Sequence, residues 1–137
     1  MTRHALPLFA LPLFAVSLFA WPVAAQEVDC NDAETQQEMT FCAEQDWQVA
    51  DADLNAAYVA AVSMMQTIDG NLPQSERGAE DNLRAAQRAW ITFRDANCAA
   101  EGYVMHGGSA EPMLIYGCLA RLSYFRAEEL WVMSQTY

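Results

Sequence analysis

Apolar residues recur every three or four positions through the middle of the chain, as they do on one face of a helix. Neither Gly nor Pro interrupts this pattern between residue 36 and Gly70, so the sequence predicts one long helix over residues 36–67. Thr35 and Glu38 have the spacing of a capping box, whose side chains accept hydrogen bonds from free backbone N–H groups at a helix start. Turn-forming residues at 69–73 end the helix. The apolar stripe consists of Trp47, Ala50, Leu54, Tyr58, Ala61, Met65 and Ile68.

Two further helices are predicted in the second half of the chain. One covers residues 76–100, and the other begins after Ser109, a capping residue followed by an acid and an early Pro, and runs to residue 133. No segment alternates polar and apolar residues as a half-buried strand would. The sequence therefore predicts an all-α fold, an antiparallel three-helix bundle with short connections. The predicted inward stripes are Leu83, Ala86, Trp90, Phe93 and Asn97, then Ile115, Cys118, Leu122, Phe125 and Val132.

The first 25 residues have the pattern of a secretory signal peptide. An apolar stretch rich in Leu and Phe runs to Trp21, and the small residue Ala25 marks a cleavage site. A membrane anchor is the weaker alternative, because Pro residues lie in and directly after the stretch. Cys30 lacks the small preceding residue that lipidation needs. We predict removal of residues 1–25 and one domain over 26–137, periplasmic or secreted, with no membrane anchor.

All four Cys lie beyond the predicted cleavage site. An even number in a short exported chain is typical of a disulfide framework, for which three pairings exist. We predict the sequential pairs Cys30–Cys42 and Cys98–Cys118, because each pair brackets one junction between segments. A reactive or metal-binding thiol is the alternative, which an oxidising compartment disfavours.

Charge is distributed unevenly along the chain. There are 18 acidic residues, seven Arg and no Lys, for a net charge of −11. Residues 26–76 hold eleven of the acids and no base, whereas six Arg accompany seven acids from Arg77 onward. Such acidity argues against nucleic acid or anionic lipid as partners, and fits a solubilising role or a basic partner. We expect the six Arg to pair mostly with the acidic first half.

Several short motifs are spread from Cys30 to Leu130. They are Thr35-Gln-Gln-Glu-Met-Thr-Phe-Cys42, Asp53-Leu-Asn-Ala-Ala-Tyr58, Gln87-x-x-Trp90-x-x-x-Arg94-x-x-x-Cys98, Gly107-Gly108-Ser109, Cys118 and Arg126-Ala-Glu-Glu-Leu130. In combination they resemble the lysozyme inhibitor LprI-like family of exported bacterial proteins. The resemblance implies an all-helical periplasmic or secreted domain that inhibits host-type lysozyme. The family's namesake is a lipoprotein, whereas this chain lacks the lipidation signal, so anchoring is not carried over.

Some polar and aromatic residues of these motifs have both a structural and a functional interpretation. The structural one, which we favour, places Arg94 and Arg126 near the bundle interior, paired with first-helix acids such as Asp51 or Asp53. It also makes Asn55 and Tyr58 a hydrogen-bonding layer between helices. The functional one makes them a binding feature. The residues concerned are Asn55, Tyr58, Trp90, Arg94 and Arg126.

The loop from Tyr103 to Ser109 is the candidate for contact with a partner. Its Gly-Gly pair lets backbone approach a partner closely, and the predicted Cys98–Cys118 bridge would hold it rigid, which lowers the entropic cost of binding. The alternative is a plain turn whose glycines supply a positive φ. The candidate partner-binding residues are His106, Gly107, Gly108 and Ser109 in the loop, with Glu44, Asp46 and Asp51 in the first helix.

Catalysis and metal binding find little support in the sequence. His106 is the one His beyond residue 25, and a nucleophile pair with Ser109 lacks an orienting group. Met105, His106, Met113 and the Met64-Met65 pair would suit copper, although Met at helical spacing more often fills a core. We expect no enzyme, cofactor or metal. The sequence favours an exported protein that binds and inhibits a cationic lysozyme; the alternative is a periplasmic structural or envelope-stress accessory protein.

Overall fold

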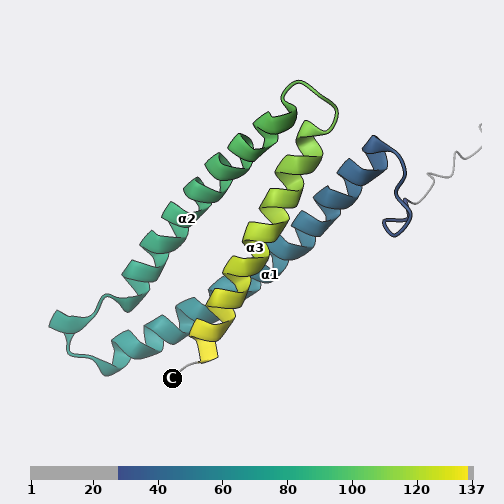
Figure 1. The fold of residues 1–137 in the computed structure, drawn as a ribbon. Helices are drawn as coiled ribbons and strands as arrows, with labels where there is room; N and C mark the ends of the chain where they lie inside the picture. Colours follow the sequence, from purple (N-terminus) through teal and green to yellow (C-terminus); the bar gives the residue numbers. More distant parts are fainter. Residues whose placement is uncertain (1–27, 136–137) are drawn as a thin grey trace, which may run out of the picture.

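The computed structural model describes residues 28–135, which fold into three helices joined by short connections (Figure 1). The chain runs along α1, returns along α2 and reverses again into α3. No strand occurs in the described part of the chain, and the predicted all-α antiparallel three-helix bundle is confirmed. The predicted signal peptide, residues 1–25, lies outside the described residues. The elements are α1 (Gln36–Asn71), η1 (Gln74–Glu76), α2 (Ala79–Gly102), η2 (Tyr103–Met105) and α3 (Glu111–Gln135).

The capping box at the start of α1 is present as predicted. The N–H of Glu38 donates to the Thr35 hydroxyl over 3.2 Å, and the N–H of Thr35 donates to the Glu38 carboxylate over 2.9 Å. The bond from the Thr35 N–H to the carboxylate is the largest cause that holds the pKa of Glu38 below its usual value. The two bonds of the capping box satisfy the N–H groups of Thr35 and Glu38, which have no partner inside the helix.

The end of α1 and the start of α2 differ from the sequence prediction, and Asp69 explains the difference. The helix continues through Asp69 to Asn71 instead of stopping at residue 67, and α2 begins at Ala79 rather than at residue 76. The Asp69 carboxylate accepts hydrogen bonds from the N–H groups of Gly78 and Ala79, both over 2.9 Å, and of Glu80 over 3.0 Å. A side chain of α1 thus caps the first turn of α2, and these bonds lower the pKa of Asp69.

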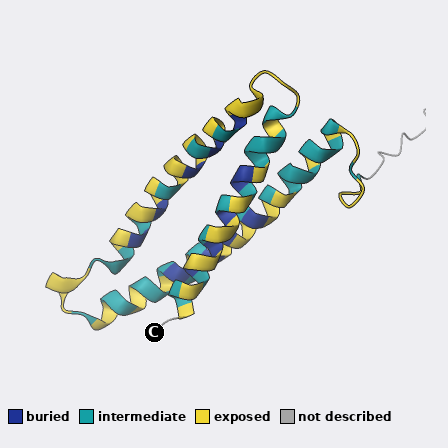
Figure 2. Cartoon of the chain, viewed as in Figure 1, coloured by how far each residue is buried: buried dark blue, intermediate teal, exposed yellow. Residues whose placement is uncertain are grey.

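Small side chains let α1 and α3 pack closely. Ala57 and Ala61 of α1 and Ala127 of α3 are fully buried, and larger residues fill the space beside them. Dark segments in Figure 2 mark this buried seam, which runs along the inner sides of the helices. The cluster consists of Leu54, Ala57, Ala61, Leu83, Ala127 and Leu130, with partly buried Tyr58, Val62, Met65, Trp90, Trp131 and Met133 against it.

The predicted inward stripe is confirmed for α1 and is wrong in part for α2 and α3. Phe93 of α2 and Phe125 and Val132 of α3 are exposed, as is Ala86. The side of α2 that faces the bundle carries Gln87 and Arg94 among its apolar residues, and both form hydrogen bonds there. A stripe traced through the apolar residues therefore predicts the wrong inward side for parts of α2 and α3. The buried residues of α2 are Leu83, Gln87, Arg94, Cys98 and Gly102.

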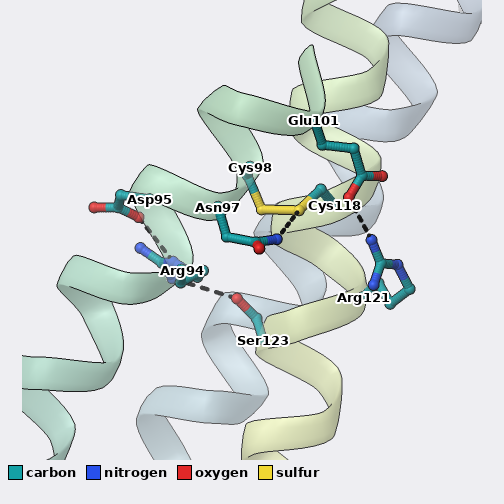
Figure 3. The surroundings of a disulfide bond; sticks show 8 residues. All are labelled: Arg94, Asp95, Asn97, Cys98, Glu101, Cys118, Arg121 and Ser123. Atoms are coloured by element: carbon teal, nitrogen blue, oxygen red, sulfur yellow. Dashed lines mark hydrogen bonds and ion pairs between the residues drawn. A yellow bond between two sulfur atoms is a disulfide. The ribbon is translucent and has the colours of Figure 1, made fainter. Parts of the chain in front are cut away.

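Both predicted disulfides are present, Cys30–Cys42 and Cys98–Cys118, so none of the four Cys is free. Figure 3 shows the second bridge joining the end of α2 to α3. The two helices are close there, because a Cβ added to Gly102 would lie 2.6 Å from Cγ1 of Ile115. The bridge is fully buried beside Leu119, and both bridges lie at the end of the bundle where α2 turns into α3. None of the described helices is long and apolar enough to cross a bilayer.

Candidate partner-binding surface

Arg94 forms a polar network that joins all three helices. Its Nη1 donates to Asp51 Oδ1 of α1 over 3.0 Å and to the Ser123 hydroxyl of α3 over 3.3 Å. Its Nε donates to Asp95 Oδ1 over 2.9 Å. The side-chain amide of Asn55 donates to the other carboxylate oxygen of Asp51 over 3.0 Å. The Arg94 side chain is only 10% exposed, and Figure 3 shows it pointing from α2 toward Ser123. The predicted ion pair with Asp51 is confirmed.

The remaining motif residues lie beside this network. The Arg94 guanidinium carbon is 5.3 Å from the centre of the Trp90 ring, within the range of a cation–π contact. Tyr58 packs against the apolar cluster and its hydroxyl interacts with Arg84 of α2, whereas Asn55 bonds within α1, so the expected contact between helices is made by Tyr58 and not by Asn55. Trp90 and Arg94 therefore contribute to the packing of the bundle.

Arg126 does not pair with an acid of the first helix, so that prediction is wrong. Its Nε donates to Gln87 Oε1 of α2 over 3.1 Å, and its Nη1 donates to Glu129 of its own helix over 3.0 Å. Its side chain is largely buried, as expected for a residue near the interior. Arg126 has a different partner from the predicted one because it lies on the side of α3 that faces α2.

The acidic first half keeps most of its charge unpaired, contrary to expectation. Within residues 28–135, Asp51 is the one acid of α1 that forms an ion pair with an Arg. The other Arg ion pairs join residues of the second half: Arg84–Glu80, Arg94–Asp95, Arg121–Glu101 and Arg126–Glu129. Most of the cationic charge is therefore balanced within the second half, and the potential along α1 stays negative.

The loop between α2 and α3 is braced by Glu111, the first residue of α3. Its carboxylate lies 3.0 Å from Nδ1 of His106 and accepts the N–H of Gly107 over 2.7 Å, and these contacts, the His106 bond first, lower the pKa of Glu111. The His106 ring stacks on Tyr103 at a centroid distance of 4.4 Å. Gly107 has the left-handed φ of 76°, which favours glycine. These contacts restrain the loop.

The structure brings the loop next to the acidic start of α1. Ser109 and Glu44 line the same shallow hollow with Phe41, and Gln36 of α1 donates to the sulfur of Met113 nearby. Ser109 was predicted to cap α3, but it forms no hydrogen bond within the described residues. The helix begins two residues later, at Glu111, so Ser109 does not cap it.

The predicted candidates therefore do not form one site. Glu44 lies beside the loop, Asp46 borders a different groove, and Asp51 is engaged by Arg94. Neither Glu44 nor Asp46 has a side-chain hydrogen bond or ion pair in the described part of the chain. Both are therefore available to a partner, whereas Asp51 is occupied in the bundle.

The catalytic and copper hypotheses find no matching geometry. His106 contacts Glu111 rather than Ser109, and Met65 packs in the apolar cluster far from the loop that holds Met105. Residues 28–135 contain no group of three His, Cys, Asp or Glu side chains arranged for a metal ion.

Sequence reasoning missed an exposed apolar groove between α1 and α3. Val49, Tyr124 and Phe125 line it, and each is at least half exposed. Phe125 was instead assigned to the inward stripe. The available signal was the composition of α3, which carries apolar residues on more sides than one core face can use.

These features define the molecule as a small helical protein braced by two disulfides, with an acidic first helix and a rigid loop at one end. Its sequence matches the family model described as "Lysozyme inhibitor LprI" over residues 29–130. The chain belongs to the LprI lysozyme-inhibitor family. Inhibition, not catalysis, defines that family.

Two similar proteins extend this comparison. The chain is 45% identical over 114 residues to an uncharacterised protein of Rhizobium meliloti (strain 1021), covering 80% of this chain and 82% of that protein. It also resembles the crystal structure of a DUF1311 family protein from Pseudomonas putida KT2440, with a TM-score of 0.65 and 30% identity, covering 76% of this chain and 98% of that one. Both the sequence and the fold are thus shared with other bacterial proteins.

Proposed function

We propose that this protein is an exported inhibitor that binds a basic lysozyme through the acidic start of α1 and the adjoining loop. The observation that carries the proposal is the family match over residues 29–130. The unpaired acids of α1 support it, since they would attract a cationic protein over a distance and speed association. Two disulfides fit an oxidising periplasmic or extracellular compartment, as does the predicted signal peptide.

The rigid loop is the candidate for blocking the partner's cleft. Tyr103, Val104 and Met105 are exposed at the start of the loop, and Glu111 bonds to His106 and Gly107, which follow them. A fixed loop loses little conformational entropy on binding. Glu44, beside the loop, would lie against the basic rim. Asp46 lies farther along α1 and would add to the attraction through its charge, while Gly107, Gly108 and Ser109 allow close approach.

The test is lysozyme digestion of bacterial cell walls at low ionic strength, with the protein recovered from the export compartment of an expressing host. The double variant Glu44→Gln/Asp46→Asn should raise the concentration needed for half inhibition by roughly tenfold, because two unpaired charges are lost. Glu76→Gln/Asp81→Asn is the matched control: it removes two exposed acids at the opposite end and should change inhibition less than about twofold.

Digestion that proceeds unchanged in the presence of the wild-type protein would refute the proposal. Recovery of an envelope component from a periplasmic pull-down, together with such a result, would favour the accessory role instead.

A further inference from the structure

The groove between α1 and α3 is an apolar surface that the described chain leaves uncovered. Val49 of α1 is 72% exposed, and Tyr124 and Phe125 of α3 are 53% and 54% exposed. Ala50 and Ala120, being small, leave the space between these larger side chains hollow. The rings of Tyr124 and Phe125 meet edge to face, with their centroids 5.9 Å apart, and both are exposed to solvent. Exposed aromatic residues of this kind are typical of interface centres.

The charges around the groove are complementary to a cation. Asp46 stands at its edge with no side-chain partner in residues 28–135, and Asp53 is held by the indole N–H of Trp131 over 3.0 Å. Arg121, the one cation lining the groove, is bonded to Glu101 over 2.8 Å. On the next turn of α3, Glu128 and Glu129, the second of which is paired with Arg126, border another hollow that includes Phe125. The apolar surface therefore has acidic side chains on both sides.

An Arg or Lys side chain fits both the apolar lining of the groove and the negative charge at its edge. Its aliphatic stem would pack against Val49 and the aromatic rings, and its charged end would reach Asp46. An uncharged apolar segment would leave Asp46 without a partner, and a negatively charged one would be repelled.

We propose that the groove lined by Val49, Tyr124 and Phe125 docks a segment of the basic partner in which an Arg or Lys lies beside an apolar residue. For the identity of the partner this inference rests on the proposed function. The groove lies on a different part of the surface from the loop, so it supplies a second contact that adds affinity.

The experiment compares Phe125→Ser with Phe93→Ser, because the two Phe are almost equally exposed, 54% and 56%, and only the first lines the groove. Binding to hen egg-white lysozyme is measured by calorimetry. Phe125→Ser should weaken binding by about tenfold or more, and Phe93→Ser by less than about twofold. Val49→Ser, at a still more exposed position, should also weaken binding, and thermal melts of all three verify the fold.

A second arm separates the groove from the lysozyme hypothesis. A synthetic peptide of alternating Arg and Leu is titrated into the wild-type protein and followed by NMR. Shifts concentrated at Val49, Ala120 and Tyr124 support the groove even if lysozyme does not bind, in which case only the proposed function fails. Lysozyme binding that is unchanged in Phe125→Ser and Val49→Ser overturns the groove and leaves the function standing. Peptide shifts confined to Glu44 and the loop, or absent, also overturn it.

Discussion

A single guanidinium group joins the three helices, and its chemistry explains why this position is Arg. Arg94 donates to Asp51 of α1, to Asp95 of α2 and to Ser123 of α3 at the same time. A planar fork with several fixed donors can reach three acceptors, whereas a Lys ammonium would act as one compact charge. Its position over Trp90 also shields the group from water.

Replacing Arg94 by Ala should lower the free energy of unfolding by about 2 kcal/mol, a fall in Tm of roughly 10 °C. The value is moderate for a buried ion pair because Asp51 and Asp95 can regain water once Arg94 is gone. Thermal unfolding followed by circular dichroism measures the effect. Arg88→Ala, at an exposed site on the same helix, should leave Tm nearly unchanged. An unaltered melt combined with lost lysozyme binding would show that Arg94 serves recognition instead of the fold.

Pairs between residues were predictable from the sequence only in part. Arg94 and Asp51 could be matched, because both were expected near the interior of neighbouring helices. The partners of Arg126, which are Gln87 and Glu129, could not be predicted, since the sequence does not show which side of α3 faces α2. The cap provided by Asp69 was also missed, because its three partners lie nine to eleven residues along the chain.

At the scale of the elements, the sequence predicted which segments are helical far better than which sides they bury. Long uninterrupted patterns and the capping box identified all three helices. The inward sides of α2 and α3 were misjudged because apolar residues were used as the marker of burial. Gln87, Arg94 and Ser123 are buried by virtue of their hydrogen bonds, and only the assembled bundle supplies their partners.

The junction of α1 and α2 should be sensitive to acid. The pKa of Asp69 in the folded protein is below its ordinary value, so its contribution to stability is present above the unfolded pKa, about 3.9, and is lost as the pH falls through the folded value. Asp69→Ala should therefore lower Tm by several degrees at neutral pH, and this difference should shrink under strongly acidic conditions.

Melting curves over a pH series measure this effect. Asp81→Asn is the control, because Asp81 is exposed on the first turn of α2 and caps no other helix. A difference between wild type and Asp69→Ala that stays the same at every pH would contradict the role of the ionised carboxylate.

At the scale of the whole molecule, charge is the feature that would govern association. The local pairing of most Arg with acids of the second half leaves α1 strongly negative. We expect the affinity for lysozyme to fall by roughly tenfold or more as NaCl rises from about 20 mM to about 300 mM, because salt screens exposed charges.

Dissociation constants measured across this salt series give the slope. The Glu44→Gln/Asp46→Asn variant should show a shallower dependence than the wild type, and the Glu76→Gln/Asp81→Asn control should follow the wild type. An affinity that does not change with salt would contradict steering by the acidic helix.

The sequential pairing of the cysteines has a consequence for the integrity of the chain. Cys30–Cys42 lies within the first half and Cys98–Cys118 within the second, so no covalent crosslink joins α1 to the other two helices. Only the segment between Asn71 and Ala79 connects them along the backbone, and it contains Arg77 exposed to solvent. A single tryptic cut after Arg77 would yield two polypeptides, one with eleven acids and one Arg over residues 26–77, the other with seven acids and five Arg over residues 78–137. Noncovalent contacts of α1 with the other two helices would then be all that keeps the two halves together: its packing against α3, the Arg94–Asp51 ion pair and the Asp69 cap on α2.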